Sequence, residues 1–339
     1  MSSGQTRSIV LVGCGRMGQN HFRAIQRSTS FELVGVVDPE NPKIDPSFLG
    51  NIPLFKSFNE LSSNNISFSC ALIASPTGTH SEVSEMLLNK GIHIFVEKPL
   101  TSTYEQSEKA SNLAKNNNLV MVVGHVERFN PGTQQLKAIL SNNMIGELVS
   151  VQTYRGGMAP QYIGGGNDVL LDMAVHDLDV LQMCFGSFSV ESARFTLLGR
   201  NSFPHHVDLL LKNAKKGSAL VTASWLSPMR SRNLRVVGTE GVAYLDFIER
   251  KTTVYKKPLP NNPSSPEILQ GSDVLQSMGL QPIKDALDAQ LQDFFDVLEK
   301  HDHPTKLKDF HQTICSGQEG ANVVKLTEEA RKRAKEVKI

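Results

Sequence analysis

The chain has 339 residues, of which 40% are hydrophobic and 20% charged, a composition typical of a soluble globular protein with room for two domain cores. Its formal net charge of +1 argues against nucleic acid or an anionic membrane as a partner, and no apolar run approaches the length of a membrane helix. The four cysteines are scattered without a C-x-x-C pair, and few residues precede the first apolar run, which predicts a cytoplasmic protein without a disulfide framework, a bound metal or a signal peptide.

The first predicted elements are a strand, a glycine turn, a helix and a second strand. The apolar run Ile9–Val12 leads into the turn 13–18, with the sequence G-C-G-R-M-G, and a helix is expected over 17–25. A second apolar run, 33–37, ends at Asp38, twenty residues after the last glycine of the turn. This order is the arrangement of a dinucleotide-binding site. The alternative is a glycine-rich turn in a doubly wound domain that binds nothing.

Each glycine of the turn has a separate expected role. Gly13 permits the tight turn, Gly15 lets the backbone approach the pyrophosphate, and Gly18 lets the helix pack closely on the strand. The helix N-terminus then offers its N–H groups to the phosphates. Asp38 is expected to accept hydrogen bonds from the adenosine ribose. No Arg or Lys follows it before Lys43, so a 2′-phosphate would meet negative charge and the sequence favours NAD over NADP.

Strand and helix signals continue to alternate up to about residue 125. The expected elements are a strand over 69–74, a helix over 79–88, a strand over 92–96, a helix over 103–116 and a strand over 119–123. Such alternation predicts a parallel sheet covered on both faces, and therefore an N-terminal Rossmann dinucleotide-binding domain over 1–125.

The pattern changes after Pro131 to consecutive strands with short turns, which predicts an antiparallel sheet. The expected elements are helices over 134–140 and 169–185, strands over 148–154, 188–198, 205–212, 217–226, 232–238, 241–248 and 252–257, a loop over 258–275, and helices over 281–300 and 306–337. The predicted fold class is thus α/β plus α+β. An α+β substrate-binding and oligomerisation domain, built on a largely antiparallel open sheet, is expected over 126–339, with ligands at the carboxyl ends of the parallel strands.

One strand of the second domain suggests self-association. Along 219–226, one face carries Ala219, Val221, Ala223 and Trp225, and the other carries Leu220, Thr222, Ser224 and Leu226. Neither face is strongly polar, whereas a half-solvated sheet alternates more cleanly. Burial of the second face against another subunit predicts a homodimer or homotetramer. The alternative is a solvent-exposed face that tolerates a few leucines.

Two segments carry candidate catalytic groups. Lys98 directly follows a predicted parallel strand, so its ammonium can reach the cofactor crevice, hydrogen-bond a substrate hydroxyl and stabilise an alkoxide. On the helix 169–185, Asp172 and His176 are at positions i and i+4, and a carboxylate beside a histidine raises its basicity, as a general base requires. Asp168 and Asp179 are expected on the same face. The alternatives are a solvated lysine and an exposed ion pair.

The segment 124–131, G-H-V-E-R-F-N-P, follows the last parallel strand. It is the crossover between the two predicted domains, so its polar groups are expected at the ligand cleft. By itself it also fits an ordinary linker.

Taken together, these segments resemble the glucose–fructose oxidoreductase/inositol dehydrogenase family over nearly the whole chain. The matching segments are G-C-G-R-M-G (13–18), V-V-D (36–38), A-S-P-T-G-T-H (74–80), V-E-K-P-L (96–100), G-H-V-E-R-F-N-P (124–131) and L-D-M-A-V-H-D-L-D (171–179). The resemblance implies NAD(P)-dependent oxidation of a secondary alcohol of a sugar or cyclitol. It also suggests a cis bond between Lys98 and Pro99.

The resemblance assigns roles residue by residue. It implies catalytic roles for Lys98, Asp172 and His176. It implies cofactor contacts from Gly13, Gly15, Arg16, Met17, Gly18, Asp38, Ser75, Thr77, His80, Glu97 and Lys98. It implies substrate contacts from Lys98, His125, Arg128, Asn130, Arg155, Asp172, His176, Arg230 and Arg232.

Within the family, the chain is most similar to the UDP-N-acetylglucosamine 3-dehydrogenases and their uronic-acid relatives. The segment 224–241 supports this, because its Arg230 and Arg232 can meet a diphosphate. The glycine-rich stretch 161–167 departs from the more basic pattern expected there. The implied partners are a nucleotide-sugar substrate and, functionally, a PLP-dependent aminotransferase that consumes the 3-keto product, in routes to lipid A or surface polysaccharide. A free-sugar or inositol dehydrogenase and a non-enzymatic NAD(P)-sensing regulator are the alternatives.

Overall fold

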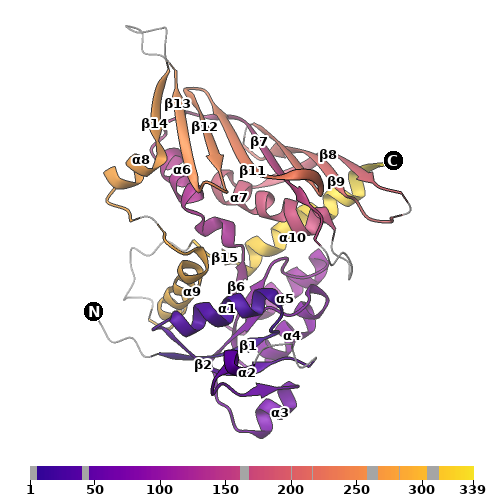
Figure 1. The fold of residues 1–339 in the computed structure, drawn as a ribbon, viewed down its shortest axis with the longest axis vertical. Coiled ribbons are helices and arrows are strands. Elements are labelled where there is room, and N and C mark those ends of the chain that lie inside the picture. Colours follow the sequence, from indigo (N-terminus) through magenta and orange to yellow (C-terminus); the bar gives the residue numbers. More distant parts are fainter. Residues whose placement is uncertain are drawn as a thin grey trace. The chain divides into compact units, whose positions relative to one another are not determined.

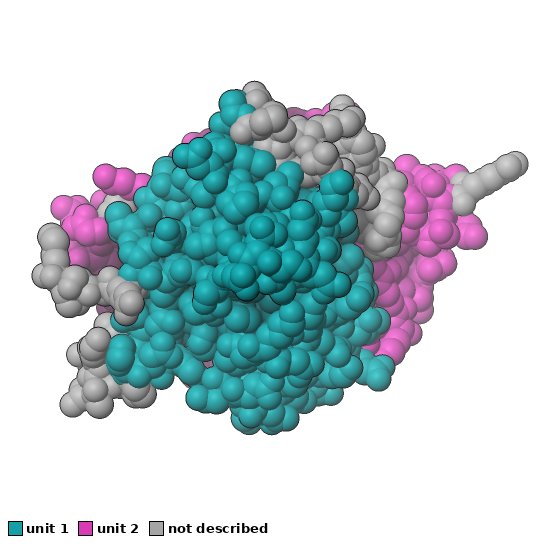
Figure 2. Space-filling view, turned by 90° about the horizontal axis from the view of Figure 1, so that it is seen from below, with its two compact units in different colours: residues 1–126, 287–324 teal, residues 127–286, 325–339 magenta. Residues whose placement is uncertain are grey.

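The computed structural model describes residues 6–39, 46–160, 168–199, 201–215, 217–257, 266–281, 283–303 and 313–339. The chain divides into two compact units, coloured separately in Figure 2. Unit 1 comprises residues 1–126 and 287–324, and unit 2 comprises residues 127–286 and 325–339. The sequence-based division at 125/126 differs from this in one respect, because 287–324 return to the first unit.

Unit 1 is a Rossmann-type unit built on a seven-stranded sheet (Figure 1). The strand order is β15-β6-β5-β4-β1-β2-β3, and all pairs are parallel except β15 with β6. Its strands are β1 (Arg7–Val12), β2 (Phe31–Val37), β3 (Leu54–Phe55), β4 (Cys70–Ile73), β5 (His93–Glu97), β6 (Met121–Gly124) and β15 (Cys315–Ser316). Its helices are α1 (Arg16–Arg27), α2 (Pro46–Leu49), α3 (Phe58–Ser63), α4 (Thr77–Asn89), α5 (Tyr104–Asn116) and nearly all of α9 (Ala286–Asp302), and α10 (Gly317–Arg333) begins here.

Local sequence explains these elements. Strands β4 and β6 are buried along their whole length, as expected for parallel strands covered on both faces. Two helices begin at side-chain caps: Ser57 accepts a hydrogen bond from the Glu60 N–H, and Thr103 accepts one from the Gln106 N–H. The alternation of strands and helices predicted for this part of the chain is confirmed.

Aromatic packing explains why 287–324 return to unit 1. The buried stripe of α9 contains Leu291, Phe294, Phe295 and Leu298 at helical spacing. The Phe294 ring lies 5.6 Å from the Phe31 ring of β2 and 5.9 Å from the Phe95 ring of β5, measured between centroids. The order of elements along the chain gives no sign of this return, because α9 follows the strands of the other unit.

Unit 2 is an α+β unit on a nine-stranded mixed sheet, with the order β14-β13-β12-β11-β7-β10-β9-β8-β16 (Figure 1). The β7–β10 and β8–β16 pairs are parallel and the others antiparallel. Its strands are β7 (Leu148–Met158), β8 (Phe188–Leu197), β9 (His206–Asn213), β10 (Ser218–Ser224), β11 (Leu226–Gly238), β12 (Gly241–Asp246), β13 (Lys251–Lys256), β14 (Glu267–Gln270) and β16 (Ala334–Lys338). Its helices are η1 (Val126–Phe129), α6 (Pro131–Ser141), the π-helical turn η2 (Leu170–Ala174), α7 (Val175–Phe185), α8 (Gly271–Ser277) and the end of α10.

The two faces of this sheet differ sharply in burial. The β10 residues Ala219, Val221 and Ala223 are at most 1% exposed, whereas Leu220 between them is 41% exposed. On the same face of the sheet, Leu210 of β9, Tyr244 of β12 and Tyr255 of β13 are exposed to a similar extent. The strand therefore presents one core face and one outer face that carries large apolar side chains.

Two predicted segments near the C-terminus were wrong in part. The expected loop 258–275 contains β14 and most of α8, and residues 258–265 lie outside the described residues. Of the expected helix 306–337, residues 306–312 lie outside the described residues, α10 forms a helix that ends at Arg333, and the strands β15 and β16 precede and follow it. β16 pairs with β8, so strand pairing overrides the helical pattern of the last residues. Among the described residues, no helix is long and apolar enough to cross a membrane.

Candidate active site

The glycine turn after β1 leaves room where a dinucleotide needs it. Gly13 has a φ of +86°, and a Cβ there would lie 2.6 Å from the Ser75 backbone. A Cβ at Gly18 would collide with the Gly13 carbonyl oxygen, which explains the close packing of α1 on the turn. A Cβ at Gly15, in contrast, would meet no atom within 4 Å. Gly15 therefore faces the open space that a pyrophosphate would fill.

The first turn of α1 suits an anion. Its N-cap is Gly15, no side chain caps it, and no acidic residue lies in the first turn. The N–H groups of this turn and the positive end of the helix dipole can therefore act on a phosphate group. Arg16 is exposed and Met17 half-buried at the same end. The residues present fit the phosphates of NAD.

Asp38 lies at the carboxyl end of β2, beside the glycine turn. Its Oδ2 accepts a hydrogen bond of 2.8 Å from the Cys14 N–H. Burial, and then the charge of Asp38, raise the pKa of the Cys14 thiol to about 11, so the thiol stays neutral at physiological pH. The turn thus brings no thiolate toward a bound phosphate.

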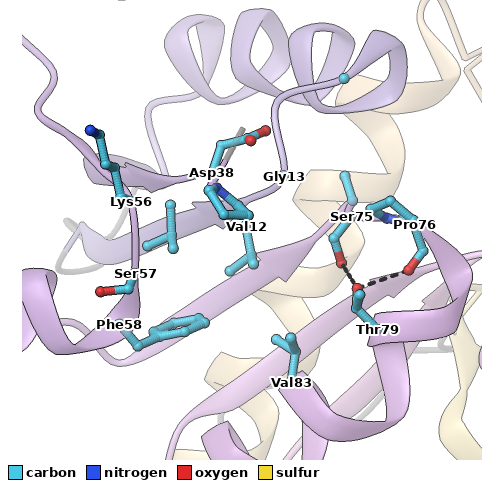
Figure 3. Close-up of a pocket in the computed structure, with 14 residues that line it drawn as sticks. Val12, Gly13, Asp38, Lys56, Ser57, Phe58, Ser75, Pro76, Thr79 and Val83 are labelled. Carbon is cyan, nitrogen blue, oxygen red and sulfur yellow. Dashed lines mark hydrogen bonds between the residues drawn. The ribbon is translucent and has the colours of Figure 1, made fainter. Parts of the chain in front are cut away.

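A cavity of about 610 Å³ opens beside this turn in unit 1 (Figure 3). It is lined by Val12, Gly13, Gly15, Val37, Asp38, Pro39, Lys56, Ser57, Phe58, Ala74, Ser75, Pro76, Thr79 and Val83. Its apolar walls, with a carboxylate and hydroxyls at the rim, suit an adenosine. The sequence analysis missed Lys56, Ser57 and Phe58. The signal was their position directly after β3, the strand that pairs with β2.

The turn between β4 and α4 supplies hydroxyls and a buried histidine. The hydroxyls of Ser75 and Thr79 lie 2.7 Å apart, and Thr79 also donates to the Pro76 carbonyl oxygen (Figure 3). Thr77 begins α4, whose N-terminus has no side-chain cap. His80 is 1% exposed, with Nδ1 3.0 Å from the Pro99 carbonyl oxygen and Nε2 2.9 Å from the Ser75 carbonyl oxygen. These partners connect two turns of the protein, so the cofactor contact expected for His80 stays a prediction.

Lys98 follows β5 at the same edge of the sheet, and the bond between Lys98 and Pro99 is cis, as predicted. The Glu97 carboxylate is directed into the unit, where Oε1 lies 2.5 Å from His21 Nε2 and Oε2 accepts the Lys98 N–H at 3.1 Å. Burial alone raises the pKa of Glu97, but the hydrogen bond from His21 and the charge of Lys98 outweigh it, and the net pKa lies below the usual value. Glu97 is therefore a carboxylate, and its expected cofactor contact stays a prediction.

Unit 2 supplies the second group of candidate residues, at the start of the helix predicted over 169–185. Asp172 lies in η2 and His176 in α7, and both are half-buried among buried neighbours. The indole Nε1–H of Trp225 donates to Asp172 Oδ2 at 3.2 Å. The sequence analysis assigned Trp225 only to a sheet face, although its position just after β10 offered a signal. The indole holds the Asp172 carboxylate, and His176 lies one helical turn away. Such a carboxylate and histidine can act as an acid–base pair.

The two other acids predicted on the same face, Asp168 and Asp179, have structural roles. Asp168 Oδ1 accepts the N–H groups of Leu170 and Leu171, and its Oδ2 accepts from Arg331 at 2.7 Å. Asp179 is fully buried against the Arg128 guanidinium. The predicted grouping of four polar residues on one face therefore reduces to Asp172 and His176 as accessible groups.

Two arginines expected to bind substrate are buried in ion pairs. Arg128 is 2% exposed and makes a bidentate contact with Asp179. Arg155 is 1% exposed and contacts Asp177 and Glu127, each at 2.9 Å. Burial lowers the pKa of Arg155, but the two carboxylates outweigh it and raise the pKa overall. These geometries favour positioning roles, and direct substrate contact stays a prediction for both residues.

Asn130 is likewise engaged inside unit 2. Its Oδ1 caps α6 through the Gly132 N–H, and its Nδ2 donates to Glu127 and to the Phe247 carbonyl oxygen. His125 lies just before the end of the first segment of unit 1 and is 1% exposed. The structure does not test the substrate contacts predicted for these two residues, and residues 161–167 lie outside the described residues.

Arg230 and Arg232 on β11 differ from the buried arginines. Arg230 is exposed, and the side chain of Arg232 is 30% exposed with its NH1 3.9 Å from Glu127 Oε1. Burial, and then the positive charges of Arg155 and Arg230, lower the pKa of Arg232. A positive potential of this kind is relieved by a bound anion such as a diphosphate.

Two family models match the chain. Residues 7–125 match an oxidoreductase family with an NAD-binding Rossmann fold, and residues 133–244 match the GFO/IDH/MocA C-terminal domain. The rhizopine catabolism protein MocA of Rhizobium meliloti is 30% identical over 250 residues, which cover 70% of this chain and 77% of that protein.

Other proteins are similar to this chain over nearly its full length. The UDP-N-acetylglucosamine 3-dehydrogenase of Acidithiobacillus ferrooxidans is 22% identical over 325 residues, 93% of each chain, and its solved structure matches with a TM-score of 0.78 over 98% of each chain. A 3-ketoreductase from Actinomadura kijaniata, solved with TDP-benzene and NADP, is 16% identical with a TM-score of 0.78 over 99% of this chain and 100% of that chain. At this identity the solved structures establish the fold. With the family models, they show that the chain is an NAD-binding oxidoreductase of the Gfo/Idh/MocA family.

Proposed function

We propose that this oxidoreductase uses NAD to oxidise the 3-hydroxyl of a nucleotide sugar, and that UDP-N-acetylglucosamine is its substrate. The observation that carries the nucleotide-sugar assignment is the cationic environment of Arg232. This side chain is partly exposed, its nearest carboxylate oxygen is 3.9 Å away, and Arg155 and Arg230 add positive charge around it. A diphosphate would supply the missing negative charge, whereas a free sugar or inositol would not.

The similarity to a UDP-N-acetylglucosamine 3-dehydrogenase over 93% of both chains supports the same substrate. An identity of 22% leaves the sugar and the reacting hydroxyl as a proposal. The predicted 3-keto product would be a substrate for a PLP-dependent aminotransferase, which converts a ketone into an amine.

The proposed chemistry divides between the candidate residues. When bound, NAD supplies a nicotinamide that accepts a hydride. His176 takes the proton of the substrate hydroxyl, and Asp172, held by Trp225, keeps the histidine basic. Lys98 hydrogen-bonds the same oxygen and stabilises its developing charge. The alternative assignment makes Lys98 the base, with His176 as the relay.

We also propose a preference for NAD over NADP. Asp38 lines the cavity with a carboxylate, and a 2′-phosphate beside it would be repelled. Lys56 lines the same cavity and acts in the opposite direction. The expected result is tighter binding of NAD without complete exclusion of NADP, measured by titration of the cofactor-free protein.

The outer face of the unit 2 sheet supports a proposal of self-association. Leu210, Leu220, Tyr244 and Tyr255 are each 38–42% exposed on this face, and such apolar surface is typical of an interface between subunits. A homodimer or homotetramer is therefore expected. Light scattering at micromolar concentration tests this, and a monomer would overturn it.

One panel experiment tests the reaction. The protein is incubated with NAD and, separately, with UDP-N-acetylglucosamine, UDP-glucose, free N-acetylglucosamine and myo-inositol, and NADH absorbance is recorded. NADH formation with UDP-N-acetylglucosamine, lost in the Arg232→Ala variant through a raised KM, supports the proposal. Turnover of myo-inositol or the free sugar alone would identify a free-sugar or inositol dehydrogenase. No turnover with any substrate despite tight NAD binding would favour the NAD-sensing regulator.

A further inference from the structure

The turn that carries Lys98 is flanked by two buried histidines that the proposed chemistry does not use. His21 of α1 contacts the Glu97 carboxylate, which in turn accepts the Lys98 N–H. On the other side, His80 of α4 lies against the carbonyl oxygens of Pro99 and Leu100. We infer that His21 and His80 are positioning residues that hold Lys98 in place for the reaction, His21 by way of Glu97. This inference rests on the proposed role of Lys98.

The contact between His21 and Glu97 is buried and close. Their side chains are 3% and 8% exposed, and the Nε2–Oε1 distance is 2.5 Å. A carboxylate without its donor in such a place would lose hydration with little in return, so it would move or take up a proton. The imidazole therefore fixes both the charge and the position of Glu97.

Close neighbours limit the space beside Glu97. A Cβ added at Gly124 of β6 would lie 2.9 Å from Glu97 Oε1 and 3.1 Å from the Phe95 ring. The Phe95 ring also meets the His21 ring edge-on, with centroids 5.3 Å apart. Packing on this side therefore supports the position in which the other carboxylate oxygen accepts the Lys98 N–H.

His80 constrains the other side of the same turn. Its Nδ1 lies 3.0 Å from the Pro99 carbonyl oxygen and 3.2 Å from that of Leu100, while Nε2 lies 2.9 Å from the Ser75 carbonyl oxygen. Carbonyl oxygens only accept hydrogen bonds, so a ring nitrogen that carries a proton donates to the turn that it faces, and the ring packs between the Ser75 turn and the Lys98 turn. The backbone of Lys98 is thus anchored before and after the residue.

The placement of His21 has a functional consequence. The first turn of α1 forms the expected pyrophosphate site, and His21 lies on the same helix. One side chain therefore connects the helix that would hold the cofactor phosphates to the turn that carries the lysine. A small displacement of a reacting group can cost up to about 100-fold in rate, which is why such a contact matters for turnover more than for cofactor affinity.

Hydrogen exchange tests the anchoring without any substrate. We expect the His21→Leu variant, which lacks the donor, to exchange the Lys98 amide faster than the parent, measured by mass spectrometry on the peptide that spans Glu97 to Thr101. The His21→Gln variant retains an N–H donor and should restore protection. The matched control is His93→Asn, at the opposite end of β5, which should leave this peptide unchanged.

Kinetics test the consequence for turnover. We expect His21→Leu to lower kcat by about 10- to 100-fold while the NAD dissociation constant changes by less than about threefold. If His21 acts through Glu97, the double variant with Glu97→Gln should be no slower than the slower single variant. Additive losses would overturn the route through Glu97. If His21→Leu does not fold, His21→Ala, which also lacks the donor, takes its place in both comparisons.

The outcomes separate this inference from the proposed function. Unchanged exchange at Lys98 in His21→Leu would overturn the anchoring role, whatever substrate the protein uses. Faster exchange at Lys98 with parental kcat would overturn the catalytic consequence. Failure of the substrate panel, in contrast, would leave the exchange result intact and count only against the proposed reaction. Equally fast exchange throughout unit 1 would indicate loss of folding stability and also count against a specific role.

Discussion

The two edges of the parallel sheet in unit 1 contain similar kinds of residues but use them differently. At the amino edge, Arg7 of β1 contacts Glu299 and Asp302 at the end of α9, and His93 of β5 accepts the Val120 N–H through Nδ1. At the carboxyl edge, the charged Asp38 lines a large cavity next to the uncapped N-terminus of α1. The amino edge is a set of internal pairs, and the carboxyl edge leaves room for a ligand.

The presence of a cavity identifies the carboxyl edge as the functional one, whereas the residue types at the two edges are similar. Each edge has a histidine at β5: the half-buried His93 is the first residue of the strand, and the buried His21 contacts Glu97 at its end. The histidine at the amino edge satisfies a backbone donor, whereas His21 acts on the carboxylate beside Lys98. The predictions below test whether losses of function stay confined to the carboxyl edge.

The largest effect is expected at Lys98. Lys98→Met and His176→Asn should each lower kcat by about 10²- to 10⁴-fold, because the proposed function has both side chains act on the reacting oxygen in the transition state. NAD binding should stay close to that of the parent. Steady-state kinetics with UDP-N-acetylglucosamine give the measurement, and the exposed Lys90→Met, near the amino edge at the end of α4, is the control. Parental turnover in both variants would refute the catalytic assignment.

The glycine turn should separate folding from cofactor binding. Gly15→Ala adds a Cβ into open space, so Tm should fall by only a few degrees while NAD affinity drops by at least about tenfold. Gly18→Ala should lower Tm far more, because its Cβ collides with the Gly13 carbonyl oxygen. Thermal unfolding with and without NAD measures both quantities. Equal NAD affinity in Gly15→Ala and the parent would contradict the assigned pyrophosphate site.

Asp38 is expected to set cofactor preference with an intermediate effect. Replacing it by Ser removes a charged hydrogen-bond acceptor, a loss of about 1.5–3 kcal/mol, which corresponds to roughly 10- to 100-fold weaker NAD binding. NADP binding should improve in the same variant, and Lys56→Ala should reverse that improvement. Titration of both cofactors checks this. Tighter NADP than NAD binding in the parent would show that Asp38 has been misread.

The smallest effect is expected at the amino edge, as a change in stability rather than turnover. Burial, and then the charge of His301, lower the pKa of His93 from 6.5 to about 4. The folded state therefore binds fewer protons than the unfolded state between these values, so stability is full above pH 6.5 and falls as the pH drops toward 4.

After allowance for solvent screening of the partly exposed His93, the loss of folding stability between pH 6.5 and 4 is about 1–2 kcal/mol. His93→Asn should flatten the dependence of Tm on pH in this range and leave kcat at neutral pH unchanged. Thermal unfolding at a series of pH values gives the comparison. If Tm depends on pH with the same slope in His93→Asn and in the parent, His93 is not the source of that dependence.

Local patterns in the sequence were sufficient for the alternating elements of the first 125 residues and for the glycine turn. Glycine spacing, the acid at the end of β2 and the alternation of strands and helices depend on backbone conformation and on side-chain period, which a chain displays along its length. The same holds for Asp172 and His176, because positions four apart on a helix are neighbours in any fold.

Partners that lie far apart in the sequence were decided by the tertiary structure. The resemblance implied substrate contacts for Arg155 and Arg128, and packing sets their guanidinium groups against Asp177 and Asp179, which no local pattern predicted. The sequence also gave no sign that α9 returns to unit 1 or that His21 reaches Glu97. Burial and ion pairing depend on which elements meet in space, and that is a property of the whole packed chain rather than of any segment.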